Sequence, residues 1–428
     1  MLRIYRTELR RSPLLLALPV MVLVDVAVLF GRSRSWMGVW PEASVAVQVV
    51  TLFLGPVLAA VSAWQAGRSS RTGMPESVLA AARPAWQAEA VRLAATLTLG
   101  FLAYGTGAVA AAAVSFDAAG PGFLWPSYLL LGAAILVSFA ALGHLAGRWF
   151  PSPWFTPVVA ALGTFIGITA LGQNLGFIVL SGAPDRDVRP TPIALRLLLA
   201  AALVALAVFA PALPGRRAGL RARPLTWGLR GCATAAAAVV LVVFAAIPGA
   251  GGIQRDRTSA DAAPLCRRDG DGVPEVCVWP EHRKYLPELT AMARRLSEVP
   301  QPWLGRPAAF YEEGLRRTGL GDTGFAITEG HTRTAAMAMA QAVFAQSLRH
   351  CDLPVDNAAA WRSSDRIHLW LEYRAMGVDP DVADRGLHMS GVADAESAAR
   401  AAVVQPEQAQ AQWTAGERAV LAAAGCTS

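Results

Sequence analysis

One carboxylate lies deep within the first long apolar stretch of the chain. Asp25 stands in Leu-Val-Asp-Val-Ala, with apolar residues on both sides. In a membrane, an ionisable group at that depth is costly unless it faces a cavity or a partner. Asp25 is therefore a candidate intramembrane polar site, in contact with a substrate or a proton along a pathway. We give equal weight to a structural interpretation, in which Asp25 forms a hydrogen bond to a neighbouring helix or lies close enough to the outer surface to be hydrated.

The cysteines suggest a second kind of chemistry, the formation of disulfides. Cys232 lies in the last long apolar stretch, where we expect a small buried residue. The other four, Cys266, Cys277, Cys351 and Cys426, follow it, and an even number is typical of two disulfides in an oxidising compartment. Two Asp-Gly turn signals between the first two favour a disulfide that closes a hairpin, so that the last two form the second pair. Other pairings of the four remain open.

The remaining residue types form no recognisable catalytic centre. No histidines have the His-Glu-x-x-His spacing of a zinc peptidase, and no serine lies in Gly-x-Ser-x-Gly. Glu312 and Glu313 are adjacent, and adjacent helix positions point about 100° apart, so we expect a solvated helix face rather than paired carboxylates. We therefore predict a chain without catalytic residues, without a bound metal and without a cofactor, and not an enzyme.

Lys284 is the only lysine in the chain, and every other basic residue is an arginine. A P-loop requires a lysine after its glycine-rich loop, to reach the β- and γ-phosphates of a nucleotide. Lys284 lies in His-Arg-Lys-Tyr, so the sequence contains no P-loop. The arginine preference, together with abundant Ala, Gly and Pro, indicates the coding bias of a high-GC bacterium rather than phosphate binding.

Charge is distributed unequally along the chain. The sequence is 54% hydrophobic and only 16% charged, with a mean hydropathy of +0.39, whereas soluble domains carry about 25% charged residues. Residues 1–250 hold eight of the 31 acidic residues, and the basic residues divide equally, 19 to each part. The net charge is therefore +11 up to residue 250 and −4 beyond it. We interpret this asymmetry as membrane topology and exclude a nucleic-acid partner.

Apolar segments of membrane-spanning length fill the first part of the chain. A helix needs about 20 apolar residues to cross the hydrocarbon core of a bilayer. Residues 1–13 are basic with a few apolar members, which predicts a helix along the cytoplasmic interface. The transmembrane domain, residues 14–248, contains seven candidate spans: 14–30, 45–66, 93–115, 125–146, 154–171, 193–213 and 229–248.

The arginines predict how these spans are oriented, because basic residues accumulate on cytoplasmic connections. With the N-terminus in the cytoplasm, 14 arginines fall on the inside and five on the outside. Seven spans then place residues 249–428 outside the cytoplasm, where disulfides form. We predict a multi-pass protein of the bacterial cell membrane with an extracytoplasmic C-terminal domain.

That C-terminal domain, residues 249–428, has mainly helical patterns. We expect a small disulfide-linked β-element at its start and a binding or gating role. The predicted fold is all-α, a transmembrane helix bundle followed by this mainly helical domain. Apolar residues recur at helical spacing over 278–298, 306–317, 331–349, 357–376, 393–403 and 414–424.

Two pairs of glycines lie four residues apart within predicted spans. Gly143 and Gly147 form one pair, and Gly163 and Gly167 form the other. Small residues at this spacing let two helices approach closely, although the spacing is common in any alanine-rich membrane protein.

The connection between the second and third predicted spans is long. Residues 74–84 begin like a helix, with Pro75 and Glu76 in the first turn, and end at a proline. Val78 and Leu79 are apolar residues of this segment. The segment is a candidate docking surface for another protein, with a simple amphipathic connector as the equal alternative.

These features resemble the permease subunits of ABC-2-type transporters, in which a basic interfacial helix precedes the first span and a coupling helix follows the second. The stretch Arg-Ser-Ser-Arg-Thr-Gly-Met-Pro-Glu-Ser-Val-Leu-Ala-Ala-Ala-Arg-Pro-Ala-Trp-Gln, from Arg68, is similar to the family's charged, glycine-containing turn and acidic helix start. Residues 173–181 resemble its partly re-entrant outer helices. The resemblance covers about residues 1–213. Gln-Ala-Gly-Arg replaces the family's acid-rich run, and the seventh span and C-terminal domain extend beyond its usual six spans.

The resemblance implies a function and partners. A separate ATPase subunit would contact Pro75, Glu76, Val78 and Leu79 and supply the energy to move a hydrophobic or amphipathic substrate. The resemblance also implies contact with membrane lipid and assembly as a homodimer or a heterodimer of permeases. The competing interpretation is a membrane-anchored extracytoplasmic binding or interaction protein without transport activity, whose spans only hold and orient the C-terminal domain.

Overall fold

A computed structural model describes the chain as two compact units. Unit 1 comprises Met1–Ala118, Gly122–Gly182 and Arg186–Arg255, and unit 2 comprises Ala119–Pro121, Ala183–Asp185 and Asp256–Ser428. Each unit has a core of its own. The residues described are 2–31, 33–68, 85–172, 175–210, 227–248, 252–258, 260, 262–315, 323–328, 330–348, 351, 356–377 and 393–426.

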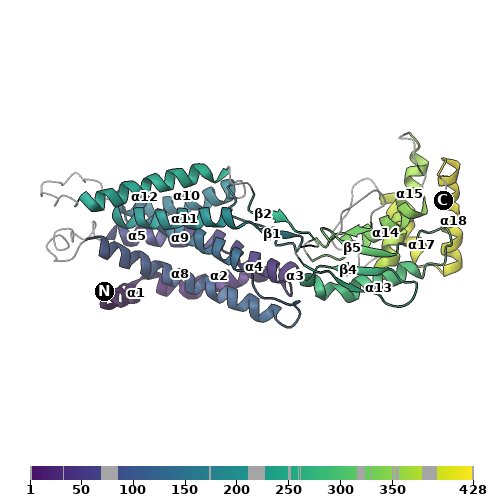
Figure 1. The fold of residues 1–428 in the computed structure, drawn as a ribbon, viewed down its shortest axis with the longest axis horizontal. Helices are drawn as coiled ribbons and strands as arrows, with labels where there is room; N and C mark the ends of the chain where they lie inside the picture. Colours follow the sequence, from purple (N-terminus) through teal and green to yellow (C-terminus); the bar gives the residue numbers. More distant parts are fainter. Residues whose placement is uncertain are drawn as a thin grey trace. The chain divides into compact units, whose positions relative to one another are not determined.

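Unit 1 is a bundle of helices (Figure 1). It begins with the short basic helix α1 (Leu2–Arg11), which buries none of its residues. Further helices follow, and most of them are apolar because their sequences contain runs of Leu, Val and Ala with few charges. They are α2 (Pro13–Gly31), α3 (Ser33–Trp36, a single turn), α4 (Trp40–Val49), α5 (Thr51–Ala66), α8 (Ala85–Ser115), α9 (Pro126–Trp149), α10 (Phe155–Leu171), α11 (Pro190–Phe209) and α12 (Trp227–Ala246).

Five helices among the described residues are long and apolar enough to cross a membrane. One of them runs over Trp40–Ala66, because α4 continues into α5 through Val50, whose backbone is helical. The segments expected at 154–171 and 229–248 are also helices, α10 and α12, but their described apolar stretches are shorter. The expected count of seven spans therefore stays a prediction, while the membrane character of unit 1 rests on five helices of sufficient length.

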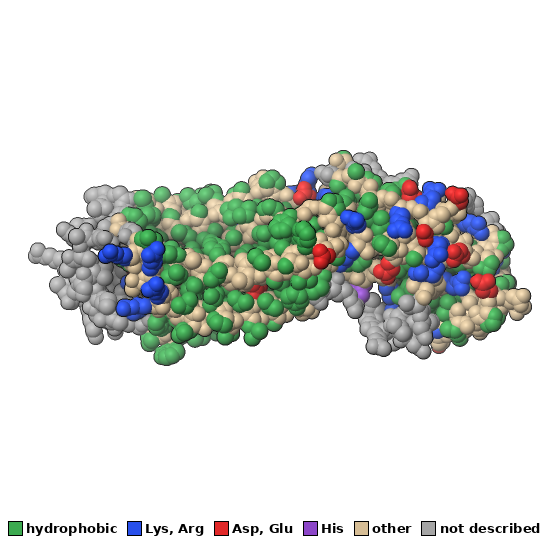
Figure 2. Space-filling model, turned by 90° about the horizontal axis from the view of Figure 1, so that it is seen from below, with side chains coloured by type: hydrophobic (Ala, Val, Ile, Leu, Met, Phe, Trp, Pro, Cys, Tyr) green, Lys and Arg blue, Asp and Glu red, His purple; other side chains and the backbone are tan. Residues whose placement is uncertain are grey.

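On the face that Figure 2 shows, most side chains at the surface of unit 1 are apolar, whereas charged side chains are spread over unit 2. Leu16 of α2 is 87% exposed and Leu241 of α12 is 71% exposed. Apolar surface on this scale is unstable in water and is typical of a surface that meets lipid. Cys232 of α12 is exposed as well, so the expectation of a buried thiol is wrong. The reason is that, among the described residues, α12 packs mainly against α11, and Leu241 and Val242 of α12 are exposed.

The two glycine pairs of unit 1 have different surroundings. A Cβ atom added at Gly143 or Gly147 would lie 2.1 or 2.0 Å from a backbone oxygen of α5, at Ala59 or Ala63. This pair therefore permits the close packing of α9 on α5. On α10, a Cβ added at either glycine of the second pair, at 163 or 167, would meet nothing within 4 Å.

A small sheet belongs to the end of unit 1 away from α1. Strand β1 (Arg186–Val188) pairs with β2 (Gln254–Asp256), and Val188 and Ile253 join a buried apolar cluster beside them. Arg196, at the start of α11, is 1% exposed and donates hydrogen bonds to three backbone carbonyls. It stabilises the polypeptide locally rather than presenting a free charge to solvent.

Unit 2 contains a four-stranded sheet that is larger than the expected β-element. The strands are ordered β3 (Leu265–Arg267), β4 (Glu275–Val278), β5 (Ala309–Glu312) and β6 (Gly324–Phe325). β3 and β4 are antiparallel, and the other two pairs are parallel. The connection between the parallel strands β4 and β5 contains the helical residues 280–297, as that geometry requires.

Strand β5 corrects the prediction of a helix over 306–317. Phe310 and Glu312 are buried, whereas Ala309 and Tyr311 between them are only partly buried, which is the alternation of a strand. The aromatic pair Phe310 and Tyr311 favours a strand, and pairing of β5 with both β4 and β6 overrides the helical spacing of the apolar residues.

The other helical patterns of unit 2 do form helices. The longest, α15, begins where the Asn357 side chain accepts the backbone N–H of Ala360 and ends at Gly377, whose φ of +62° favours glycine. Its residues Trp370 and Leu371 lie in the core. The elements are the 3₁₀ helix η2 (Pro280–Tyr285), α13 (Leu286–Ser297), α14 (Arg333–Ser347), α15 (Ala358–Met376), α17 (Ala393–Val403) and α18 (Glu407–Ala423).

Both expected disulfides are present in unit 2. Cys266 and Cys277 are paired residues of β3 and β4, and their disulfide crosslinks this hairpin. Cys351 and Cys426 form the second disulfide, which ties the end of α18 to the segment before α15. The prediction of the two pairs is confirmed.

Candidate functional site

Four charged or titratable side chains meet inside unit 1 where α8 begins and α9 ends. Glu89 Oε2 lies 2.9 Å from His144 Nε2, and Arg92 donates a hydrogen bond of 3.1 Å to Glu89 Oε1. Arg148 lies one helical turn beyond His144 on α9. The side chain of His144 is 1% exposed and that of Glu89 is 14% exposed. We call Glu89, Arg92, His144 and Arg148 the charged cluster.

Arg148 extends the charged cluster to a third helix. Its Nη1 donates to the carbonyl of Ala207 at 2.6 Å and, more weakly, to that of Val208 at 3.4 Å. The last carbonyls of a helix lack partners within the helix and carry partial negative charge, so a guanidinium there is favourable. The rings of Trp86 and Phe209 lie 5.7 Å apart beside it. The start of α8 is thus fixed to the ends of both α9 and α11.

A second polar chain connects α8 to the beginning of the protein. Gln65 of α5 donates to Ser12 at 2.8 Å and accepts from Thr96 of α8 at 3.0 Å. The Tyr5 hydroxyl of α1 lies 2.7 Å from the Thr98 hydroxyl of α8. Hydrogen bonds between helices in an apolar environment fix their relative rotation. The first half of α8 is therefore held by α1, α5, α9 and α11.

The candidate docking residues Pro75, Glu76, Val78 and Leu79 lie outside the described residues. The described part of α8 starts at its first residue, Ala85, directly after that segment. The charged cluster begins four residues further on, at Glu89. The sequence shows its members only as isolated charges near the ends of predicted spans, and the pairing depends on how the helices meet.

Asp25 of α2 is fully buried, on the side of α2 that packs against α8. Both carboxylate oxygens lie against Gly107, where an added Cβ would be 2.4 Å from Oδ2. Its complete burial disfavours the interpretation of a hydrated residue at the surface. A contact in a pathway and a structural role beside α8 stay open as predictions.

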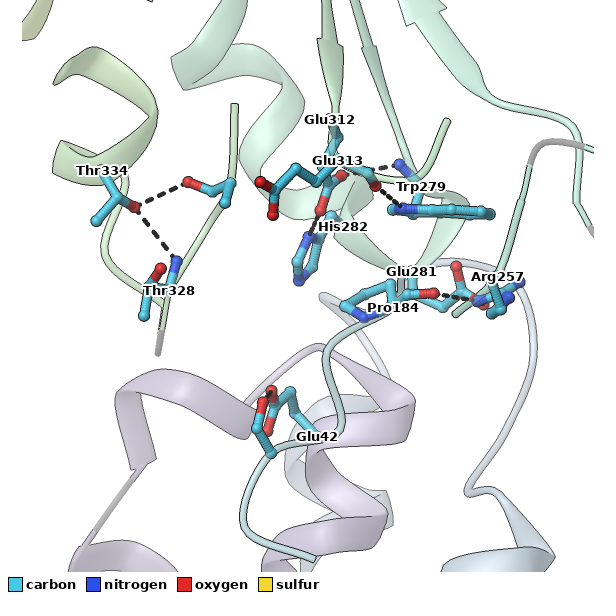
Figure 3. A network of polar contacts seen from close by, with 12 residues as sticks. Glu42, Pro184, Arg257, Trp279, Glu281, His282, Glu312, Glu313, Thr328 and Thr334 are labelled. Atoms are coloured by element: carbon cyan, nitrogen blue, oxygen red, sulfur yellow. Dashed lines mark hydrogen bonds and ion pairs between the residues drawn. The ribbon is translucent and has the colours of Figure 1, made fainter. Parts of the chain in front are cut away.

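Unit 2 contains a compact polar network around Trp279 (Figure 3). Glu312 accepts the backbone N–H of Trp279 at 2.9 Å, and its other oxygen lies 2.5 Å from His282 Nδ1. Arg257 donates to Glu281 at 3.0 Å and places its guanidinium 4.5 Å from the centre of the indole. Each of these side chains is buried. The network connects β5, η2, Trp279 between β4 and η2, and Arg257, which follows β2.

This network corrects the expectation for the adjacent glutamates. Glu312 is buried on β5 and has partners for both oxygens, whereas Glu313 exposes its side chain and uses its backbone carbonyl to accept the Trp279 indole N–H. The two carboxylates are neither a solvated helix face nor a convergent pair, because Glu312 is buried at the end of β5 and Glu313, just beyond the strand, is exposed. The saturated partners of Glu312 indicate a structural role.

One group of potential metal ligands occurs among the described residues. The ligand atoms of Cys266, Glu275 and Cys277 lie within 4.8 Å of one another. Both sulfurs belong to the β3–β4 disulfide, and metal binding by cysteine requires the thiolate. The group is therefore part of a crosslinked hairpin and does not supply a cysteine-based metal centre.

Comparison with known proteins gives one match to a protein family. A family described as a domain of unknown function, DUF7224, matches residues 276–426. The matched region lies within unit 2 and runs from β4 to the last cysteine. No curated protein and no solved structure matches the chain.

Proposed function

We propose that the chain is a permease-like membrane subunit of an ABC-type transporter. In this proposal it has seven spans, a cytoplasmic N-terminus and an extracytoplasmic unit 2. A separate ATPase docks on residues 74–92 and drives the movement of a hydrophobic or amphipathic substrate. The observation that carries the proposal is the charged cluster, which fixes the start of α8 to two neighbouring helices.

The charged cluster lies where movement of the docking segment could be transmitted to the helix bundle. A movement of residues 74–84 can reach the bundle through α8, which is the next described element of the chain. Glu89 and Arg92 lie in its first two turns, and Glu89 contacts His144 of α9, from which Arg148 contacts α11. Separating α8 from α9 would leave the largely buried Glu89 carboxylate without its hydrogen bond to His144, and an unpaired polar group in an apolar environment is strongly disfavoured. Rotation of α8 would thus be transmitted to α9 and α11.

Independent features support the proposed membrane orientation. The arginine distribution favours a cytoplasmic N-terminus. With seven spans, unit 2 then lies in an oxidising compartment, in agreement with its two disulfides. The exposed apolar surface of unit 1 supports its insertion into a bilayer.

The test is capture of the ATPase from native membranes and measurement of its activity in the purified complex. Glu76→Arg and Leu79→Asp should abolish capture, because they alter the docking segment. Glu89→Gln should retain capture but reduce substrate-stimulated ATP hydrolysis, because it removes the charge that fixes α8. Glu8→Gln, an equivalent change on α1 outside the charged cluster, is the matched control. Failure of the native, crosslinked chain to capture any ATPase would falsify the proposal.

A second function is favoured by unit 2 itself. It has its own apolar core and two disulfides, and the family match falls entirely within it. A membrane-anchored binding protein would use this unit alone. In that case a fragment of residues 253–428 should fold, oxidise and bind the same ligand as the full chain, and the docking-segment variants should have no effect.

A further inference from the structure

An apolar groove runs between α9 and α10 in unit 1. It has a volume of about 430 Å³, within the range of about 300–1,000 Å³ for sites that hold small molecules. On α9 its lining includes Phe139, Gly143 and Ala146, which recur at helical spacing. On α10 it is lined by Val159, Gly163 and Gly167, which recur in the same way. The glycines of α10 leave the groove open, because no atom occupies the position of their absent side chains.

The polar groups of the groove have partners in the protein backbone. Thr156 donates its hydroxyl hydrogen bond to the carbonyl of Phe150. Thr164 donates to the carbonyl of Ala160 at 2.6 Å, within α10 itself. Hydroxyls that are already bonded in this way offer little to a polar ligand. The groove therefore favours a hydrocarbon.

The length of the groove corresponds to one leaflet of a bilayer. Its lining on α10 extends from Phe155 to Gly167, which at about 1.5 Å per residue is roughly 18 Å. Half of a hydrocarbon core is about 15 Å. The groove starts at the short 150–154 connection between two spans. Beyond its deep end, Ile135 and Ile168 form a buried cluster with Phe139 packed against it.

We propose that this groove binds one acyl chain of a membrane phospholipid, which enters from the leaflet beside residues 150–154. The inference rests on the membrane-spanning part of the proposed function and needs no ATPase. The groove is continuous with the exposed apolar surface of α10, where Leu162 and Ile166 are more than half exposed. In a bilayer that surface is covered by lipid chains, so a phospholipid reaches the groove without leaving its leaflet.

The test uses the full chain in nanodiscs that contain phosphatidylcholine with a diazirine midway along one acyl chain. After illumination, mass spectrometry of peptides locates the label. We expect label concentrated on residues 139–167, relative to the exposed faces of α2 and α12. A free diazirine fatty acid at the same concentration should label the groove less, because it lacks the headgroup that holds a chain in register with the leaflet.

Variants that fill the groove give the decisive comparison. The double substitution Gly163→Leu and Gly167→Leu places side chains in open space and should remove most of the label. Gly105→Leu on α8 is the matched control, because a Cβ there also meets nothing within 4 Å but lies outside the groove. Thermal unfolding of each variant verifies that the fold is retained.

Three results would overturn the inference. Label spread equally over all exposed apolar helices would indicate only surrounding lipid. Label unchanged by the two leucines would place the lipid elsewhere. A disulfide between two copies of the Gly163→Cys variant, with little label in the native chain, would show that a second copy covers the groove. Extraction of the native chain from membranes by alkaline carbonate would instead contradict the proposed membrane insertion itself.

Discussion

Asp25 of α2 has space for its carboxylate only because Gly107 of α8 has no side chain. The sequence does not predict this contact, because the two residues lie more than eighty positions apart. A carboxylate within an apolar segment can be recognised from its neighbours alone. Its packing partner depends on how two helices meet, which local patterns do not specify.

The substitution Gly107→Ala should destabilise unit 1 by about 1–3 kcal/mol, the usual cost of overpacking a core. The new methyl group would lie 2.4 Å from Asp25 Oδ2 and force that side chain to move. Asp25→Ala in the same chain should recover part of the loss, so that the two effects are not additive. Thermal unfolding in detergent measures all three variants. Additive effects would show that the two residues do not interact.

Burial raises the pKa of the Asp365 carboxyl in α15 above its ordinary value, against the lowering effect of nearby His368. The folded state thus keeps this proton to higher pH than the unfolded chain. Its stabilising contribution is complete below the unfolded pKa of about 3.9 and is lost as the pH rises through the folded value. Asp365→Asn should therefore be more stable than the native chain at pH 7, and equal to it in strong acid. Denaturation at the two pH values tests this, and a constant difference would exclude titration of Asp365 as the cause.

At the scale of elements, long apolar segments were predictable and short mixed segments were not. About 20 consecutive apolar residues can hardly form anything but a membrane or core helix, and α2, α9 and α11 follow their predicted segments closely. Strand β5 was predicted as a helix, because four residues are too few to define a period and their pairing partners are distant in sequence. The incorrect expectation that Glu312 lies on a solvated helix face followed from the prediction of a helix where β5 forms.

The glycines of α9 and α10 make a matched pair for measuring helix packing. Gly143→Ala should cost about 3 kcal/mol or more, because its methyl group would lie 2.1 Å from the backbone oxygen of Ala59 in α5. Gly163→Ala should stabilise the helix by about 0.5–1 kcal/mol, because its methyl group meets open space and alanine is the better helix former. Unfolding of the two variants in the same detergent is the measurement. Equal effects would contradict the assigned contact between α9 and α5.

At the scale of the whole molecule, the two units depend on different forces. Unit 1 buries polar contacts within an apolar exterior, and unit 2 has a conventional core with two covalent crosslinks. The cysteine pairs were predictable because turn signals marked the first pair and left one partner for each remaining cysteine. The charged cluster was not, because it needs the ends of three helices to converge.

Loss of the longer disulfide should be the more damaging. Its cysteines are 75 residues apart, against 11 for the hairpin pair. In the chain-entropy description, these loops correspond to about 4.5 and about 2.8 kcal/mol of stabilisation. Cys351→Ser with Cys426→Ser should therefore lower the unfolding free energy of unit 2 more than Cys266→Ser with Cys277→Ser. The reverse order would show that constraint of the unfolded chain does not dominate.

The exposed thiol of Cys232 gives the native chain a built-in reporter of sidedness. The other four cysteines are oxidised, so a maleimide should modify this position alone without any engineered change. Cys232 lies near the start of α12, soon after the arginine-rich residues 216–223. A small membrane-permeant maleimide should label it in intact cells, whereas an impermeant maleimide should do so only after the membrane is opened. Labelling by the impermeant reagent in intact cells would show that the start of α12 faces the outside of the cell, opposite to the proposed orientation.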